Sequence, residues 1–177
     1  MTKKLNIALI GCGSWGKNIA RNLHQIGTLA CIYDADRSLS KKLNQDFKLH
    51  NYTINDIFKN ENIQALVIAS TAKTHKDIAE EALLNNKDVL IEKPFCLSLS
   101  EATTLSKLAI KKNRVLMVGH LLNYHNAFIK MKDLIKEGKI GKIKNIRAHR
   151  LALGAIRSHE SVVYDLAAHD ISMILSI

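Results

Sequence analysis

The chain has 177 residues, 47% of them hydrophobic, which is enough to bury the core of one full domain and part of a second. It contains one proline, no low-complexity tract and no run of 18 apolar residues, so neither a long disordered linker nor a membrane span is indicated. The net charge of +10 is spread along the sequence without a nucleic-acid motif or interleaved aromatic residues, which favours a solvated basic surface and no nucleic-acid partner.

The amino terminus leads directly into an apolar run, and no cleavable apolar segment precedes it. We therefore expect a cytoplasmic protein with no membrane partner. Cys12, Cys31 and Cys96 lack C-x-x-C spacing, which favours buried thiols in a reducing compartment over disulfides or zinc. Cys12 falls inside a glycine turn, where a small turn residue is a simpler interpretation than redox chemistry.

The first 36 residues predict a dinucleotide-binding unit. A short apolar strand, a glycine turn, a helix and a second strand ending in an acid follow one another in the order that such a unit requires. A lone G-x-G-x-x-G is weak evidence, but here the surrounding pattern agrees with it. The parts are a strand over 5–10, the glycines Gly11, Gly13 and Gly16, a helix stopped by Gly27, a strand over 29–33 and the acid Asp34.

Each part has a physical role in holding a dinucleotide. Gly11 allows the tight turn, Gly13 lets the backbone approach a pyrophosphate, and Gly16 lets the helix pack against the strand. The helix N-terminus offers free N–H groups and the positive end of its dipole to the phosphates. Asp34 can accept hydrogen bonds from a ribose diol. Arg37 is near enough in sequence to reach the adenine side, although a surface arginine is an equal alternative.

Strands and helices then alternate as far as residue 120. The strand expected over 63–70 is apolar almost throughout, as in a parallel sheet that is covered on both faces. The alternation predicts an α/β fold, a Rossmann-like doubly wound parallel sheet, as the dinucleotide-binding domain of residues 1–121. The other expected elements are a helix over 39–47, an ambiguous minor strand over 48–52, a short helix over 54–60, strands over 88–91 and 115–118, and two helices with capping boxes at Thr74–Asp77 and Ser98–Glu101.

Residues 122–177 have a different pattern, that of an incomplete second α/β domain. An amphipathic helix ending at Gly138, a long strand over 142–153 and a helix from Tyr164 onward are expected. With no complete sheet to pack on, the apolar helix positions should stay partly exposed. These positions are Phe128, Met131, Leu134 and Ile135.

Two groups of residues carry candidate chemistry. Lys93, in the turn Glu92-Lys93-Pro94, follows a sheet strand at the edge where open α/β sheets bind ligands, and there it can stabilise developing negative charge. On its own it is more simply a surface lysine. Asp165 and His169 lie one helical turn apart, a spacing that suits an oriented general base. A surface pair and a metal site that also includes His159 remain alternatives, although no strong metal motif is present.

Together these segments resemble the Gfo/Idh/MocA oxidoreductase family. The order and spacing match over nearly the whole chain, and 118–128 and 153–157 look closest to the branch that oxidises UDP-N-acetyl amino sugars or their uronates at C3. The matching segments are Ile-Gly-Cys-Gly-Ser-Trp-Gly at 10–16, Tyr-Asp at 33–34, Ala-Ser-Thr at 69–71 with His75, Glu92-Lys93-Pro94, and Asp-Leu-Ala-Ala-His-Asp at 165–170.

The resemblance implies hydride transfer between a nicotinamide cofactor and a sugar or nucleotide-sugar carbinol. Lys93 and His169 would be catalytic and Asp165 would support them. NAD is the expected cofactor, NADP being possible. A nucleotide-binding fragment or remnant without catalysis is the alternative. The residues expected to contact the cofactor are Gly11, Gly13, Ser14, Trp15, Gly16, Asp34, Arg37, Ser70, Thr71, His75, Glu92 and Lys93.

Family members continue through a full second domain that covers the substrate and builds oligomers, so a homo-oligomer is expected for a full-length form. This chain ends at Ile177, inside the helix that carries His169. Residues 122–177 are therefore expected to be the truncated start of the substrate and oligomerisation domain, with a cofactor site that is more complete than the substrate site.

Overall fold

The computed structural model describes residues 4–150 and 163–177. The chain forms two compact units, Met1–Gly119 and His120–Ile177. Among the described residues, none of the helices combines the length and the apolar character needed to span a membrane.

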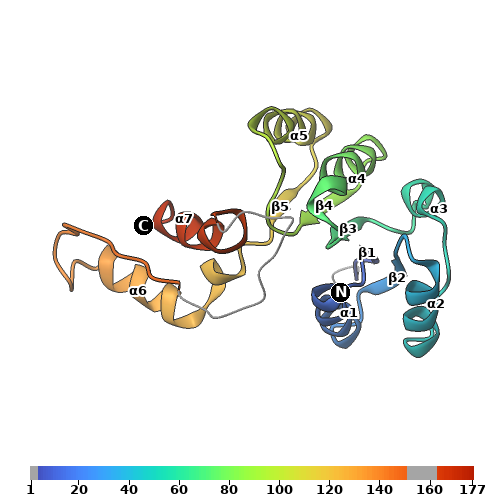
Figure 1. Cartoon of the computed structure of the whole chain (residues 1–177), viewed down its shortest axis with the longest axis horizontal. Coiled ribbons are helices and arrows are strands. Elements are labelled where there is room, and N and C mark those ends of the chain that lie inside the picture. Colours follow the sequence, from blue (N-terminus) through green and yellow to red (C-terminus); the bar gives the residue numbers. More distant parts are fainter. Residues whose placement is uncertain (1–3, 151–162) are drawn as a thin grey trace. The chain divides into compact units, whose positions relative to one another are not determined.

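The first unit contains a five-stranded sheet in which every neighbouring pair of strands is parallel (Figure 1). From β1 the chain moves outward to β2 and then returns to the other side of β1 to begin β3, so the strand order reverses there. This confirms the predicted doubly wound α/β fold and places a ligand crevice at the carboxyl ends of the strands. The spatial order is β2 (Leu29–Tyr33), β1 (Ile7–Ile10), β3 (Ala65–Ile68), β4 (Asp88–Ile91) and β5 (Leu116–Val118).

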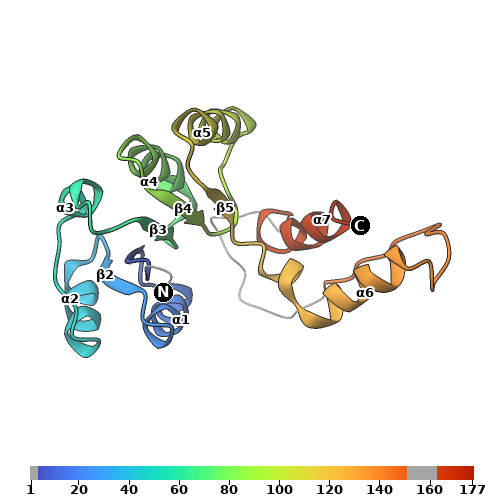
Figure 2. The same ribbon diagram turned by 180° about the vertical axis from the view of Figure 1, so that it is seen from behind.

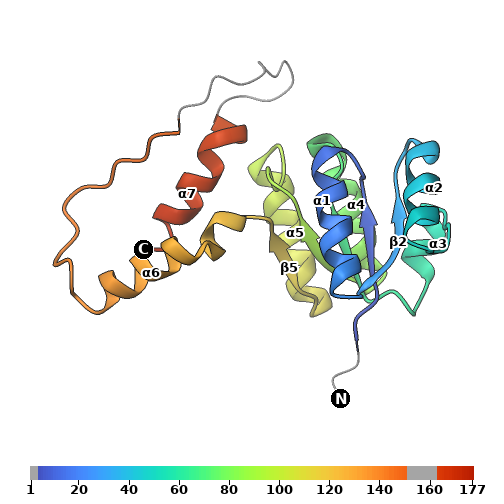
Figure 3. The same ribbon diagram turned by 90° about the horizontal axis from the view of Figure 1, so that it is seen from below.

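Helices cover both faces of this sheet. In Figure 1, α3, α4 and α5 lie above the strands and α1 and α2 lie below them; Figure 2 shows the same two layers from behind, and Figure 3 shows α1 alongside β1. The bounds are α1 Ser14–Gln25, α2 Arg37–Asp46, α3 Ile54–Lys59, α4 Ala72–Leu84 and α5 Leu99–Lys112.

The apolar strand residues divide between the two faces. Leu9 and Val67 belong to the cluster that packs with α1 and α2, whereas Ala8, Leu66 and Ile68 belong to the cluster that packs with α3, α4 and α5. All five are buried. Because neighbouring strand residues point to opposite faces, a strand covered on both sides must be apolar at every position, which is why β3 has no polar alternation.

The predicted helix starts differ in outcome. The hydroxyl of Ser98 accepts from the Glu101 N–H at 3.2 Å, which confirms this half of the predicted box. The Glu101 carboxylate accepts from the Leu97 N–H at 3.2 Å instead of the Ser98 N–H that a capping box requires. The box expected at Thr74 is wrong, because α4 already begins at Ala72 with Thr71 as its N-cap. The Thr74 hydroxyl instead donates to the Thr71 carbonyl at 2.9 Å. A capping box that the sequence analysis did not identify forms at Thr53, before α3, and it has the same T-x-x-D pattern.

The minor strand considered for 48–52 is not formed. The edge strand β2 pairs instead with one side chain, that of Asn44 on α2. Its Oδ1 accepts from the Ile32 N–H and its Nδ2 donates to the Ile32 carbonyl, both at 2.8 Å. Nδ2 also donates to Asn51 Oδ1 at 3.0 Å. The amide thus satisfies the backbone groups that a further strand would have bonded.

The second unit is helical where it is described. It contains a short 3₁₀ helix at Leu121–Tyr124, helix α6 (Asn126–Lys136), a short π-helix at Val163–Ala167 and helix α7 (Ala168–Ile174). The strand predicted over 142–153 is wrong for 142–150, which Figure 3 draws as coil after α6, while 151–153 lie outside the described residues. A strand needs backbone partners, and no other strand occurs among the described residues of this unit.

The apolar positions predicted for α6 are only partly as expected. Phe128 is buried, with 5% of its surface exposed, so the expectation of exposure is wrong for this ring. Leu134 and Ile135 are half-buried, and Met131 is 38% exposed, as expected for a helix with part of its apolar face uncovered.

The Asn44 amide predicts a large stability effect. Replacing Asn44 with Leu keeps the volume but leaves the Ile32 N–H and C=O without partners, so the free energy of unfolding should fall by about 2–5 kcal/mol in urea titrations. Asn22→Leu is the matched control, because Asn22 is exposed on α1 and bonds only within its own helix. It should change the free energy by about 0.5 kcal/mol or less. Equal effects of the two substitutions would show that the amide does not hold β2.

Candidate functional site

The glycine turn after β1 is packed so closely that side chains are excluded at two positions. Gly11 has φ +94°, and a Cβ there would lie 2.5–2.6 Å from the backbone of Ala69 and Ser70. A Cβ on Gly16 would collide with the Gly11 carbonyl oxygen. These contacts bring the start of α1 against the carboxyl ends of β1 and β3, where the sequence predicted the tight turn and close packing.

Gly13 has a different environment from the other two glycines. Nothing lies within 4 Å of the position that its Cβ would occupy. Gly13 is the N-cap residue of α1, and no side chain caps this helix end. The first turn of α1 contains no acidic residue. The N–H groups of this turn, including that of the exposed Ser14, are therefore open to an external anion. This space and charge fit a pyrophosphate.

Asp34, at the end of β2, is bonded to the glycine turn. Its Oδ2 accepts from the Cys12 N–H at 2.7 Å and its Oδ1 accepts from the Asp36 N–H at 2.9 Å. A carboxylate has about four lone-pair sites, so acceptor capacity remains on both oxygens. The carboxylate is held next to the turn and can still accept further hydrogen bonds, such as those from the hydroxyls of a ribose.

Cys12 is fully buried under the turn. Burial raises the pKa of its thiol to about 12, and the hydrogen bond and negative charge of Asp34 contribute to this rise. The thiolate is the reactive form of cysteine, so this side chain remains an unreactive thiol near neutral pH. The structure thus supports the interpretation of Cys12 as a small turn residue.

Arg37 is half-buried at the start of α2, and two contacts fix its guanidinium. Its Cζ lies 4.9 Å from the centroid of the Tyr33 ring, and its Nη1 donates to the Tyr52 carbonyl at 3.0 Å. The cation is therefore held beside the end of β2 rather than extended into solvent. The sequence could not reveal this, because Tyr52 is distant from Arg37 along the chain.

Glu92 connects three parts of the same sheet edge. Its Oε1 accepts from the indole Nε1–H of Trp15 at 2.9 Å, and its own N–H donates to the Ile68 carbonyl at 2.8 Å. A Cβ on Gly119 would lie 2.9–3.0 Å from the Glu92 carboxylate. The glycine at the end of β5 thus makes room for this carboxylate, a role that the sequence analysis did not assign to it. Trp15 remains about half exposed.

The turn that carries Lys93 is joined to the end of β3 by a buried histidine. Lys93 is half-buried, and a cis peptide bond links it to Pro94. The His75 ring is 1% exposed, with Nδ1 2.9 Å from the Pro94 carbonyl oxygen and Nε2 3.1 Å from that of Ser70. Both ring nitrogens therefore face the backbone.

Two further expected cofactor residues lie where β3 meets α4. The Ser70 and Thr74 hydroxyls are 2.8 Å apart and share a hydrogen bond. Thr71 is exposed, and its side chain makes no capping bond although it occupies the N-cap of α4. Both residues lie at the carboxyl end of a sheet strand, the edge that also carries the glycine turn.

The second unit holds the other candidate catalytic residue. His169 lies half-buried on α7, and its ring stands edge-on to that of His120 with the centroids 6.2 Å apart. Its neighbour Asp170 receives two hydrogen bonds from Arg150, at 2.9 and 2.8 Å, and these hold the pKa of the Asp170 carboxyl below its usual range. The side chain of Asp165 and the whole of His159 lie outside what the structure describes.

No group of three or more metal-binding side chains comes together within 4–150 and 163–177. The alternative metal site included His159 and the carboxylate of Asp165, which are not among the described groups. The described part of the chain therefore contributes no argument for a metal centre.

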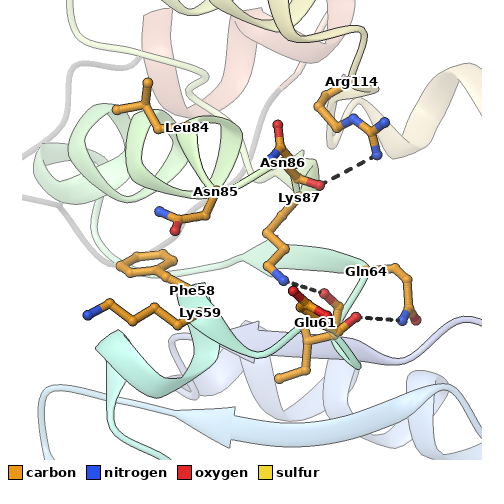
Figure 4. Close-up of a pocket in the computed structure, with 10 residues that line it drawn as sticks. Phe58, Lys59, Glu61, Gln64, Leu84, Asn85, Asn86, Lys87 and Arg114 are labelled. Carbon is orange, nitrogen blue, oxygen red and sulfur yellow. Dashed lines mark hydrogen bonds between the residues drawn. The ribbon is translucent and has the colours of Figure 1, made fainter.

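A pocket of about 450 Å³ lies at the opposite edge of the sheet, near the amino ends of β3 and β4 (Figure 4). Its buried lysine, Lys87, donates to the carbonyls of Asn60 and Ile63 at 2.6 and 2.8 Å. Burial lowers the pKa of this ammonium group, and the nearby Glu61 partly opposes that effect. The lysine is thus used to satisfy backbone carbonyls, and the pocket contains no part of the glycine turn.

The comparison with family models agrees with this geometry. Residues 5–120 match the model of the Gfo/Idh/MocA family, described as an oxidoreductase family with an NAD-binding Rossmann fold. The chain belongs to this family. The predicted resemblance is therefore confirmed, and it covers the entire glycine turn together with Asp34 and the Lys93 turn.

Individual relatives are similar over most of this chain. UDP-N-acetylglucosamine 3-dehydrogenase of Acidithiobacillus ferrooxidans is 28% identical over 172 residues, which cover 97% of this chain and 53% of the relative. A solved structure of that enzyme matches with a TM-score of 0.87 and 26% identity, covering 98% of this chain and 56% of that one. The 2,7-anhydro-N-acetylneuraminate hydratase of Escherichia coli K12 is 27% identical over 149 residues, covering 82% and 40%. The chain thus spans about half the length of these relatives or less.

The environments of Gly13 and Gly16 predict opposite effects of the same substitution. Gly16→Ala should lower the free energy of unfolding by about 2 kcal/mol or more, because the methyl group meets the backbone of the turn. Gly13→Ala should leave stability nearly unchanged but weaken NADH binding about tenfold or more, since the methyl group enters the space expected to hold the phosphates. Urea unfolding and titration calorimetry measure the two effects. Full NADH affinity in Gly13→Ala would contradict the assignment of this space.

Proposed function

We propose that this chain is the nicotinamide-binding part of a dehydrogenase that acts on a carbinol of a sugar or nucleotide sugar, and that NAD is its preferred cofactor. Membership of the family supports a nicotinamide cofactor and oxidoreductase chemistry. The similarity to UDP-N-acetylglucosamine 3-dehydrogenase supports a nucleotide sugar as the substrate class. Because the chain spans about half of that relative, activity is proposed for a form that also carries the remaining part of the second domain.

The bond between Asp34 and the glycine turn is the observation that carries this proposal. It holds the carboxylate at the end of β2 against Cys12, a residue of the turn that is proposed to bind the phosphates. That carboxylate can accept from the 2′- and 3′-hydroxyls of a ribose, whereas it would repel a 2′-phosphate. Arg37 weakens the argument for NAD, because its guanidinium is held beside the same strand end and offers a positive charge to a phosphate.

Lys93 and His169 have separate roles in the proposed reaction. The bound nicotinamide supplies the hydride acceptor. Lys93 donates a hydrogen bond to the reacting hydroxyl oxygen and stabilises its alkoxide character. His169 accepts the proton that leaves this oxygen, directly or through the lysine, and Asp165 orients its ring. The remaining contacts of the edge, from Ser14, Trp15, Ser70, Thr71 and Glu92, are proposed to position the cofactor.

The similarity to the Escherichia coli hydratase favours a second candidate, the addition or removal of water on a related sugar without net oxidation. The two candidates differ in a measurable way, since a dehydrogenase accumulates NADH as substrate is consumed and a hydratase does not. A nucleotide-binding chain without any catalysis is the third outcome, and it would bind NADH while converting neither class of sugar.

Cofactor choice is testable on the chain itself. Titration calorimetry should show NADH binding about tenfold or more tighter than NADPH, because Asp34 repels the 2′-phosphate. Asp34→Ala should reduce this preference, whereas Asp46→Ala, which removes an exposed acid from the far end of α2, should not change it. Tighter binding of NADPH than of NADH by the unchanged chain would refute the assignment of NAD.

The catalytic roles predict specific losses of turnover in a form that carries the rest of the second domain. His169→Ala should lower kcat by about 10²–10⁴-fold with nearly unchanged NADH affinity, since one general base is removed. Lys93→Met should cause a loss of the same order, and the double variant should lose less than the product of the two. The 177-residue chain itself should bind cofactor with little or no turnover. A His169→Ala variant as active as the unchanged enzyme would refute the assignment of His169 as the general base.

A further inference from the structure

The turn Glu92-Lys93-Pro94 is held at both ends by contacts from other elements of the first unit. On the side before Lys93, the Glu92 carboxylate accepts from Trp15 on α1, and the Glu92 N–H donates to β3. On the side after Lys93, the Pro94 carbonyl lies 2.9 Å from Nδ1 of His75 on α4. His75 therefore contacts the second end of the turn with a side chain from another element.

We propose that His75 is a positioning residue that carries its hydrogen on Nδ1 and donates it to the Pro94 carbonyl, fixing the backbone of the Lys93 turn. This inference rests on the proposed function, in which Lys93 bonds the reacting oxygen. It differs from a direct cofactor contact, because the ring is 1% exposed and both of its nitrogens face backbone carbonyls.

The surroundings of the ring favour the hydrogen on Nδ1. Both partners are carbonyl oxygens, which only accept, and a neutral imidazole has a single N–H. The contact with Pro94 is the shorter one and is fully buried, whereas the contact with Ser70 is partly accessible to water. Water can replace the bond to Ser70, but an unbonded Pro94 carbonyl would stay buried without a partner, which is the costlier alternative.

The position of Pro94 explains why this bond acts on Lys93. The Pro94 carbonyl directly follows the Lys93–Pro94 peptide, so holding that oxygen limits how far the Lys93 backbone can move. Without the bond, the turn loses the anchor at its second end, while the contacts of Glu92 at its first end stay in place. The lysine would then spend less time in one place relative to the edge of the sheet, although its own side chain is unchanged.

Long-range ¹H–¹⁵N correlation spectra of the ¹⁵N-labelled chain test the assignment without any turnover. A hydrogen on Nδ1 of His75, in either the neutral or the doubly protonated ring, is the expected result. A neutral ring with its single hydrogen on Nε2 would overturn the proposal. Because neither cofactor nor substrate is present, this result is independent of whether the proposed dehydrogenase activity is found.

Two amide variants separate the ring nitrogens. The Nδ2 of Asn is as many bonds from Cα as Nδ1 of His, and the Nε2 of Gln corresponds to Nε2 of His. In hydrogen-exchange mass spectrometry, His75→Gln should speed exchange in the 93–97 segment by about tenfold relative to His75→Asn. Thermal unfolding of both variants gives the control for global stability. Equal exchange in the two variants, or faster exchange in His75→Asn, would overturn the proposal.

Discussion

The contact between the start of α1 and the turn after β1 is the constraint on which the rest of the site depends. Gly16 lies against the Gly11 carbonyl, and Gly11 lies against the backbone that ends β3. Any side chain at these positions would push the helix away from the sheet. With the helix in place, its first N–H groups face the open space at Gly13, and the Cys12 N–H reaches Asp34. The steric requirement of two glycines thus sets the geometry of the turn that is proposed to hold the phosphates, and the position of the acid that is proposed to bind the ribose.

The carboxyl edge of the sheet is also joined from strand to strand by side chains. Asp34 connects β2 with β1, Trp15 and Glu92 connect α1 with β4, and His75 connects β3 with the turn after β4. Each of these bonds fixes the position of a loop. The parallel sheet alone does not fix it, because the backbone hydrogen bonds between strands end where the loops begin. Residues that are distant in sequence are thereby held at one edge, which is how a preorganised binding site is built from separate turns.

The two units contribute different parts of the proposed chemistry. The first unit contains the proposed cofactor residues and Lys93. The second contains His169, whose helix is bonded through Asp170 to Arg150. The relatives are about twice as long as this chain or more. The relatives include a protein named as a dehydrogenase and one named as a hydratase, which fits the view that a fold does not fix which reaction occurs.

The sequence by itself determined the features that depend on neighbouring residues. The glycine spacing, the apolar strands, the stop at Gly27 and the cap at Ser98 follow from local sterics and hydrogen bonding, and they were enough to predict the fold and the glycine turn. Only the tertiary structure decided the features that need a distant partner: Asn44 in place of an edge strand, Gly119 beside Glu92, and the buried ring of His75. The strand prediction after α6 was wrong over 142–150 for the same reason. The local sequence pattern cannot supply the backbone partners that a strand requires.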